Sequence, residues 1–69
     1  MKLTISIERE IDGRWITEVL ELPGVLAYGE SREDAIRLVQ ALSLRVLADR
    51  IDHGEALPDE MQAMFAVAS

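Results

Sequence analysis

The chain has 69 residues, no cysteine and one histidine, which excludes disulfides, thiolate metal sites and a histidine-rich metal site. One small domain of this size buries only about 60% of the surface of its unfolded chain, and such domains are commonly stabilised by disulfides, metals or oligomerisation. Hydrophobic residues nevertheless make up 49% of the chain. We therefore expect a homo-oligomer, either a dimer or a tetramer, without a cofactor.

Thirteen acidic and seven basic residues give a net charge of −6. Because no cluster of lysine and arginine is available to contact phosphates, the sequence predicts no direct binding of nucleic acid. An acidic chain is better suited to a basic protein partner. The sequence has no signal peptide and no apolar run of membrane-spanning length, so we expect a cytoplasmic protein without membrane contact.

Apolar and polar residues alternate over residues 2–9, which predicts a half-buried strand, and a second strand is expected at residues 15–20. A three-residue turn with Gly13 in the left-handed conformation would pair Ile5 with Val19 and place the apolar side chains of both strands on one face. A two-residue turn would separate them, so we predict the three-residue turn. The inner face then consists of Leu3, Ile5, Ile7, Trp15, Thr17 and Val19.

The opposite face of this hairpin is half apolar, since Ile16 and Leu20 lie there beside polar residues. These two residues are candidates for a partner interface. The segment Leu22-Pro23-Gly24 should end the second strand, because proline cannot donate to a strand ladder and glycine permits a sharp turn.

A short third strand is expected at residues 25–28, followed by Gly29. Ser31 is placed to cap a helix over residues 32–53, which Gly54 should terminate. The stripe expected to face the sheet is Ala35, Leu38, Val39, Leu42 and Val46. A second apolar stripe, on roughly the opposite side, is Leu44, Leu47, Ala48 and Ile51.

A single small sheet cannot cover both helix stripes. Either the C-terminal tail folds over the second stripe, or this stripe and Met64 belong to a subunit interface; both interpretations remain open. The tail itself has an ambiguous pattern, because Pro58 and the following acidic residues could open a helix, whereas the apolar alternation from Met61 onward fits a fourth strand. The elements together predict an α+β fold: an antiparallel sheet of three to four strands, in the order β-β-β-α-β, with one long helix packed on one face.

Two groups of residues could carry chemistry. Asp49 and His53, four residues apart, could supply half of a divalent metal site, although a solvated pair is the commoner arrangement. The hairpin carboxylates could support a metal-dependent nuclease, although a charged sheet edge is commoner; they are Glu8, Glu10, Glu18 and Glu21. No catalytic triad or phosphate-binding loop is present, and we expect no enzymatic activity and no bound metal.

Residues 12–33 read DGRWITEVLELPGVLAYGESRE. An acidic-Gly turn precedes an aromatic-headed strand, Leu-Pro-Gly, a short strand and a Gly-acidic-Ser turn before the helix. This order resembles the HicB-like antitoxin family, and the closing His-Gly-Glu-x-Leu-Pro at residues 53–58 fits the same pattern. The resemblance covers essentially the whole chain, and its motif positions are Gly13, Leu22, Pro23, Gly24, Gly29 and Ser31.

The resemblance implies a single HicB-like domain over residues 1–69, related to a degenerate ribonuclease H core and catalytically inert. It implies a homo-oligomer that neutralises a small basic mRNA-cleaving toxin, HicA, in a type II toxin–antitoxin system, and it favours a strand at residues 62–68. Many members also carry a C-terminal DNA-binding segment; the sequence ends at Ser69 without one, which puts autoregulation of that type in doubt. The alternative hypothesis is an orphan homo-oligomer without a toxin partner, acting as a scaffold or binding a small ligand.

Overall fold

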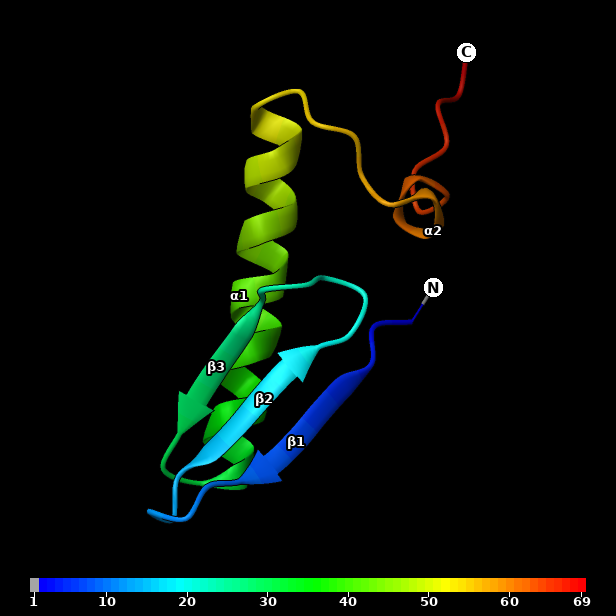
Figure 1. Ribbon diagram of the computed structural model, residues 1–69. Helices are drawn as coiled ribbons and strands as arrows, with labels where there is room; N and C mark the ends of the chain where they lie inside the picture. The colour runs from blue at the N-terminus through cyan, green and yellow to red at the C-terminus, as the bar shows by residue number, and fades with distance from the viewer. Residues whose placement is uncertain (1) are drawn as a thin grey trace.

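The computed structural model describes residues 2–69. Three strands, β1 (Ile5–Arg9), β2 (Trp15–Val19) and β3 (Leu26–Gly29), form an antiparallel sheet in the order β1-β2-β3. The long helix α1 (Arg32–Asp52) covers one face of this sheet, and the short helix α2 (Asp59–Gln62) lies in the C-terminal tail (Figure 1). The predicted α+β class, with one long helix on an antiparallel sheet, is confirmed.

The predicted strand at residues 62–68 is wrong. Within residues 2–69 no strand follows β3, and the element order is β-β-β-α-α. Pro58 instead opens a helical turn, in which its carbonyl accepts hydrogen bonds from Met61 N at 2.8 Å and Gln62 N at 3.1 Å. The Met61 side chain is buried in the core. This turn therefore buries Met61 without requiring a further strand.

The predicted three-residue turn between β1 and β2 is confirmed. Ile5 pairs with Val19, and Glu10 N donates to Arg14 O at 2.7 Å. Gly13 has φ +91°, a conformation that glycine adopts at little cost. Since a slip of one residue would reverse every side chain, this turn is what directs the predicted inner face toward α1.

The break at Leu22-Pro23-Gly24 is also confirmed. Leu22 N donates to Val19 O at 3.1 Å, and Val25 N donates to Leu22 O at 3.0 Å, so the chain reverses tightly between β2 and β3. The reversal points Leu22 into the interior, where it is fully buried. The motif thus contributes a core side chain as well as a turn.

Helix α1 begins where the sequence indicates, because Asp34 N donates to the Ser31 hydroxyl at 3.1 Å. It ends at Asp52, one residue before the predicted end, and Gly54 adopts φ +71° just beyond it. The predicted sheet-facing stripe is partly wrong. Leu38 is 37% exposed, whereas Ser43, absent from the apolar pattern, is buried. Burial of Ser43 is tolerated because its hydroxyl donates to Val39 O at 2.7 Å within the helix.

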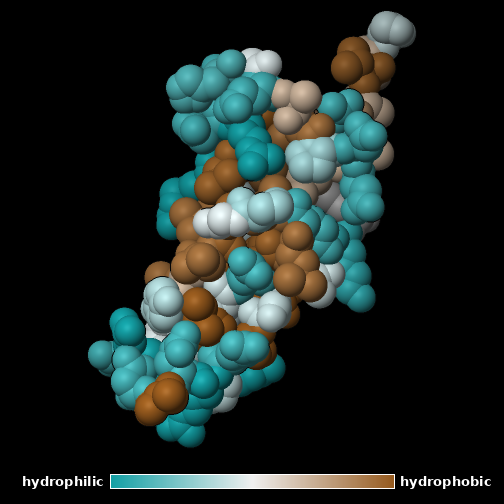
Figure 2. Space-filling view, viewed as in Figure 1, coloured by the Kyte–Doolittle hydropathy of each residue, from teal (hydrophilic) through white to brown (hydrophobic). Residues whose placement is uncertain are grey.

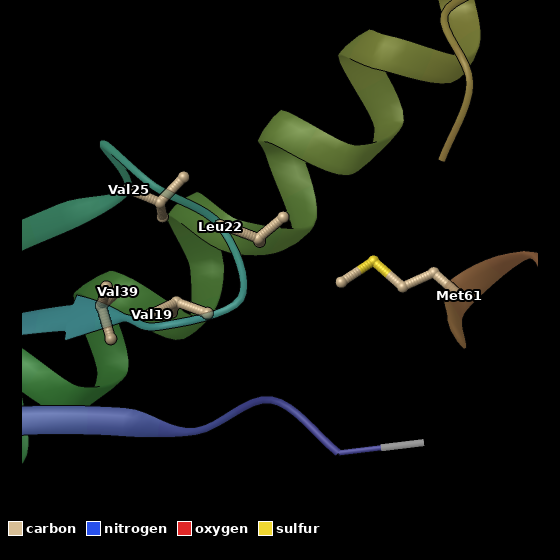
Figure 3. Packing of buried hydrophobic residues seen from close by; sticks show 5 residues of the cluster. All are labelled: Val19, Leu22, Val25, Val39 and Met61. Atoms are coloured by element: carbon tan, nitrogen blue, oxygen red, sulfur yellow. The ribbon is translucent and has the colours of Figure 1, made fainter. Parts of the chain in front are cut away.

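The core joins the turn after β2 to the middle of α1 and to the tail. Figure 3 shows Met61 approaching the other core side chains from the direction of the tail. The buried cluster consists of Val19, Leu22, Val25, Val39 and Met61. Met61 is therefore the buried side chain by which the tail joins the core, and the partly buried Leu57 packs against the same cluster.

The first turns of α1 lie directly on β2 and β3. A Cβ atom added to Gly29 would overlap Ala35 N and would lie 2.8 Å from Ala35 Cα. Beside this contact, the buried Thr17 hydroxyl lies 2.9 Å from Ala35 O and 3.2 Å from Ala27 O, so its proton can be donated to either carbonyl. Gly29 and Thr17 together set how closely the helix approaches the sheet.

Thr4 and Glu21 connect the chain before β1 to the chain after β2. Thr4 N donates to Glu21 Oε1 at 2.7 Å, and the Thr4 hydroxyl donates to Oε2 at 2.8 Å. These two donors, the backbone one first, hold the pKa of the Glu21 carboxyl below its ordinary value. The carboxylate form is therefore favoured in the folded chain.

We predict that Gly29→Ala lowers the free energy of unfolding by about 3 kcal/mol, the upper end of the usual cost of overpacking, because the new methyl group meets helix backbone. Urea unfolding followed by the fluorescence of Trp15, the single tryptophan, measures this loss. In the double variant Gly29→Ala/Ala35→Gly the overlapping backbone atoms remain. Recovery of wild-type stability in that variant would contradict a clash with main chain.

We predict that part of the loss of stability in acid comes from Glu21. A carboxyl with a lowered folded-state pKa stabilises the fold above its unfolded-state pKa, and this contribution is lost as the pH falls through the folded-state value. Glu21→Gln should therefore flatten the dependence of the urea midpoint on pH between about pH 5 and about pH 3. Thr4→Val, which keeps the backbone donor, should flatten it less; equal profiles for wild type and Glu21→Gln would refute the assignment.

Candidate functional site

The face of the sheet that points away from α1 is the first candidate surface. The antiparallel register aligns its side chains in two rows across the strands: Ser6, Glu18 and Leu26 in one row, and Glu8, Ile16 and Tyr28 in the other. We call these six residues the outer sheet face. Glu8 and Glu18 are diagonal neighbours in it, and so are Ile16 and Leu26. The carboxylates of Glu8 and Glu18 therefore lie beside the apolar side chains of Ile16 and Leu26.

A shallow groove of about 160 Å³ follows this surface and is lined by five of the six residues together with Thr17. Ile16 is half-buried at its centre, and Leu26 is more exposed. Neither Glu8 nor Glu18 forms an ion pair with any of residues 2–69. In Figure 2 apolar and hydrophilic surface is interspersed over the strands, as this arrangement requires. The outer sheet face thus combines exposed apolar area with negative charge that no neighbour neutralises.

Ile16 and Leu20 were both predicted to lie on this side. Ile16 occupies the middle of the outer sheet face, whereas Leu20 lies one residue past the end of β2 and is largely exposed. Leu20 N still donates to Thr4 O at 3.0 Å, so the residue continues the pairing of the two strands. Leu20 therefore extends the same surface beyond the strands.

Arg14 lies at the hairpin end of the outer sheet face. Its guanidinium carbon is 4.8 Å from the centre of the Tyr28 ring, and its Nε atom is 2.8 Å from Asp12 Oδ2. Hydrogen bonds from the Arg14 backbone and side chain hold the pKa of Asp12 below its ordinary value. Sequence reasoning missed this contact, although the predicted turn already placed Asp12 and Arg14 beside each other. The Arg14 cation is thus engaged by groups of its own sheet.

The second candidate surface lies between α1 and the tail. The predicted second stripe forms one wall of an open groove of about 200 Å³, and residues of the tail form the other wall. The tail covers the stripe only in part, since Leu44 remains 66% exposed and Ile51 51% exposed. We call this surface the helix–tail groove; it is lined by Leu44, Leu47, Ala48, Ile51, Leu57, Met61, Met64 and Phe65.

Each sequence interpretation of the stripe accounts for part of this groove. The tail does pack beside the stripe, and Met64 does lie with it, but Met64 and Phe65 are themselves mostly exposed. Leu57 and Phe65 were not among the predicted site residues. The apolar composition of residues 56–69 was the one indication of them in the sequence, and it does not reveal that the tail folds back beside α1. Every residue that lines the groove is apolar, so the site offers packing without any charged group.

The candidate chemical groups do not converge. Glu21 is engaged by Thr4, whereas Glu8 and Glu18 lie on the outer sheet face. Asp49 and His53 form an exposed pair, with His53 Nδ1 3.3 Å from Asp49 Oδ1. Among residues 2–69, no group of three or more histidine, aspartate and glutamate side chains is arranged to hold a metal ion. The outer sheet face and the helix–tail groove are therefore the surfaces on which a function can be argued.

Two further findings concern the chain as a whole. None of the helices formed by residues 2–69 combines the length and apolar content needed to cross a membrane. Comparisons of the chain with protein-family models, with curated proteins and with solved structures found no match in any of the three.

Proposed function

We propose that this protein is a non-enzymatic, antitoxin-like protein that binds and neutralises a small basic mRNA-cleaving toxin of the HicA type. The observation that carries the proposal is the outer sheet face, where Glu8 and Glu18 lie beside exposed apolar side chains without an ion-pair partner in residues 2–69. The net charge of −6 and the order of motifs in residues 12–33 support it.

The chemistry of this surface suits a ribonuclease as the partner. A protein that holds RNA presents lysine and arginine to the phosphates, and those cations are the groups that two unneutralised carboxylates would attract. The apolar centre formed by Ile16 and Leu26 adds area that can be removed from water, which supplies affinity beyond the ionic contacts. Occupation of the basic residues by the carboxylates would compete with RNA for the same groups, and this competition would neutralise the toxin.

The relation to a degenerate ribonuclease H core belongs to the same proposal. Residues 5–52 supply three antiparallel strands and a helix in the implied order. The tail adds no fourth strand, so this support covers the first four elements only.

The alternative of a small-ligand binder has less support. The two surfaces form grooves of about 160 and 200 Å³, below the roughly 300–1,000 Å³ typical of small-molecule sites. A larger depression of about 400 Å³ lies on the exposed hairpin tip around Ile11 and Arg14. Ile11 is fully exposed there, which leaves that depression without walls able to enclose a ligand.

We predict that the protein co-purifies with a small basic protein encoded beside its gene and that Glu18→Lys weakens the complex at least 10-fold, about 1.4 kcal/mol. The reversed charge would face the partner's cations. Calorimetric titration at several salt concentrations measures the affinity, which should fall as salt rises. Growth arrest by the toxin should be relieved by the wild-type protein and relieved less by the variant.

The matched control is Glu55→Lys, which makes the same charge change at an exposed position beyond the end of α1. It should alter the affinity by less than about 3-fold, because its charge is remote from the outer sheet face. Equal weakening by both variants would show that net charge alone drives binding. If no small basic partner binds, the toxin-binding proposal fails.

A further inference from the structure

The C-terminal half of α1 extends beyond the sheet that covers its N-terminal half (Figure 1). The radius of gyration is 14.1 Å, compared with about 11 Å for a compact domain of 69 residues. The principal extents of 52 × 22 × 16 Å describe the same elongation. In the isolated chain, the C-terminal half of α1 is therefore covered by the tail alone.

The solvent-exposed area of the chain is also larger than that of a compact monomer of the same mass. The chain exposes 5171 Å², whereas a compact monomer of 7.7 kDa exposes about 4,300 Å². The excess of roughly 800 Å² equals the area that one partner contributes to a protein–protein interface of standard size. Leu44, Ile51, Met64 and Phe65 all contribute exposed apolar area at the helix–tail groove. The surplus surface, taken over the whole chain, is thus large enough to include one interface, and its part at the helix–tail groove is apolar.

The groove is also complementary to itself. Leu44, Leu47, Ala48 and Ile51 follow the spacing of a single helix face, and Ala48 is small enough to let a second helix approach closely. When two such faces pack antiparallel about a twofold axis, Leu44 of one copy meets Ile51 of the other, and Ala48 lies near the axis. Such an interface uses the same patch on both copies and closes without leaving a free end.

A basic partner would find nothing in this groove to recognise, because its lining contains no charged residue. Two copies of a chain of charge −6 repel each other, so their contact must be apolar to be stable. We infer that the helix–tail groove binds a second copy of this chain, forming a twofold dimer through the projecting half of α1. This inference uses none of the residues of the outer sheet face and does not rest on the proposed function.

We predict that sedimentation equilibrium gives twice the monomer mass for the wild type and that Leu44→Glu raises the dimer dissociation constant at least 100-fold. Leu44 is mostly exposed, so the variant should fold with an unchanged circular dichroism spectrum. Salt should strengthen the wild-type dimer by screening the repulsion between its copies, the opposite of its effect on a toxin complex. Ile11→Glu, at the fully exposed hairpin tip, should remain dimeric.

A second measurement does not depend on the folding of Leu44→Glu. The chain has no cysteine, so Ala48→Cys introduces a single thiol close to the proposed axis. Mild oxidation should link two copies of Ala48→Cys much faster than two copies of Ile11→Cys. The inference is overturned if the wild type is monomeric at its solubility limit, if a folded Leu44→Glu stays dimeric, or if the two cysteine variants link at equal rates. The Glu18→Lys variant should lose the toxin and keep the dimer, which separates failure here from failure of the proposed function.

Discussion

The contact of the first turns of α1 with β2 and β3, at Gly29, Ala35 and Thr17, is the constraint from which the rest of the molecule follows. Gly29 permits a backbone approach that no side chain would allow, and the Thr17 hydroxyl bonds across it to the carbonyl of Ala35. The helix is thereby fixed by its N-terminal end. Its 21 residues extend about 31 Å, whereas a five-residue strand covers about 16 Å. Half of the helix therefore has no strand beneath it.

Each candidate surface is a consequence of that geometry. Docking of α1 on one face leaves the other face of the sheet to carry Glu8, Glu18 and their apolar neighbours, because strand side chains alternate between faces. The unsupported half of α1 exposes its second stripe, which the tail covers incompletely because Met61 is its one buried residue. A charged surface suited to a basic partner and an uncharged surface suited to a second copy thus lie on different elements. For this reason we expect salt to weaken the proposed toxin complex and to strengthen the proposed dimer.

The sequence predicted those features that depend on local geometry. Side-chain parity identified the turn at Gly13, and the Ser31 cap placed the start of α1 correctly. The prediction was wrong where tertiary context decides. Ser43 can be buried because its hydroxyl bonds within the helix, and Leu38 lies beside the buried stripe of Ala35, Val39 and Ser43 and remains 37% exposed. The apolar pattern of the tail was compatible with both a strand and a helix. In the structure the tail forms a helical turn that buries Met61 in the core, a contact between distant residues that the local pattern does not reveal.

The same contacts connect the size of the chain to its association. Five apolar side chains form the buried cluster, a small core for a domain that must offset the entropy of ordering its backbone. A partner that binds only the folded state adds RT ln(1 + [L]/Kd) to its stability, about 2.7 kcal/mol at a hundredfold excess over Kd. For a dimer formed through α1, this term grows with the protein's own concentration. The stability of the sheet, and with it the arrangement of Glu8, Ile16 and Glu18 on its outer face, would therefore depend on how much of the chain is paired. The helix–tail groove would in this way support the outer sheet face without touching it.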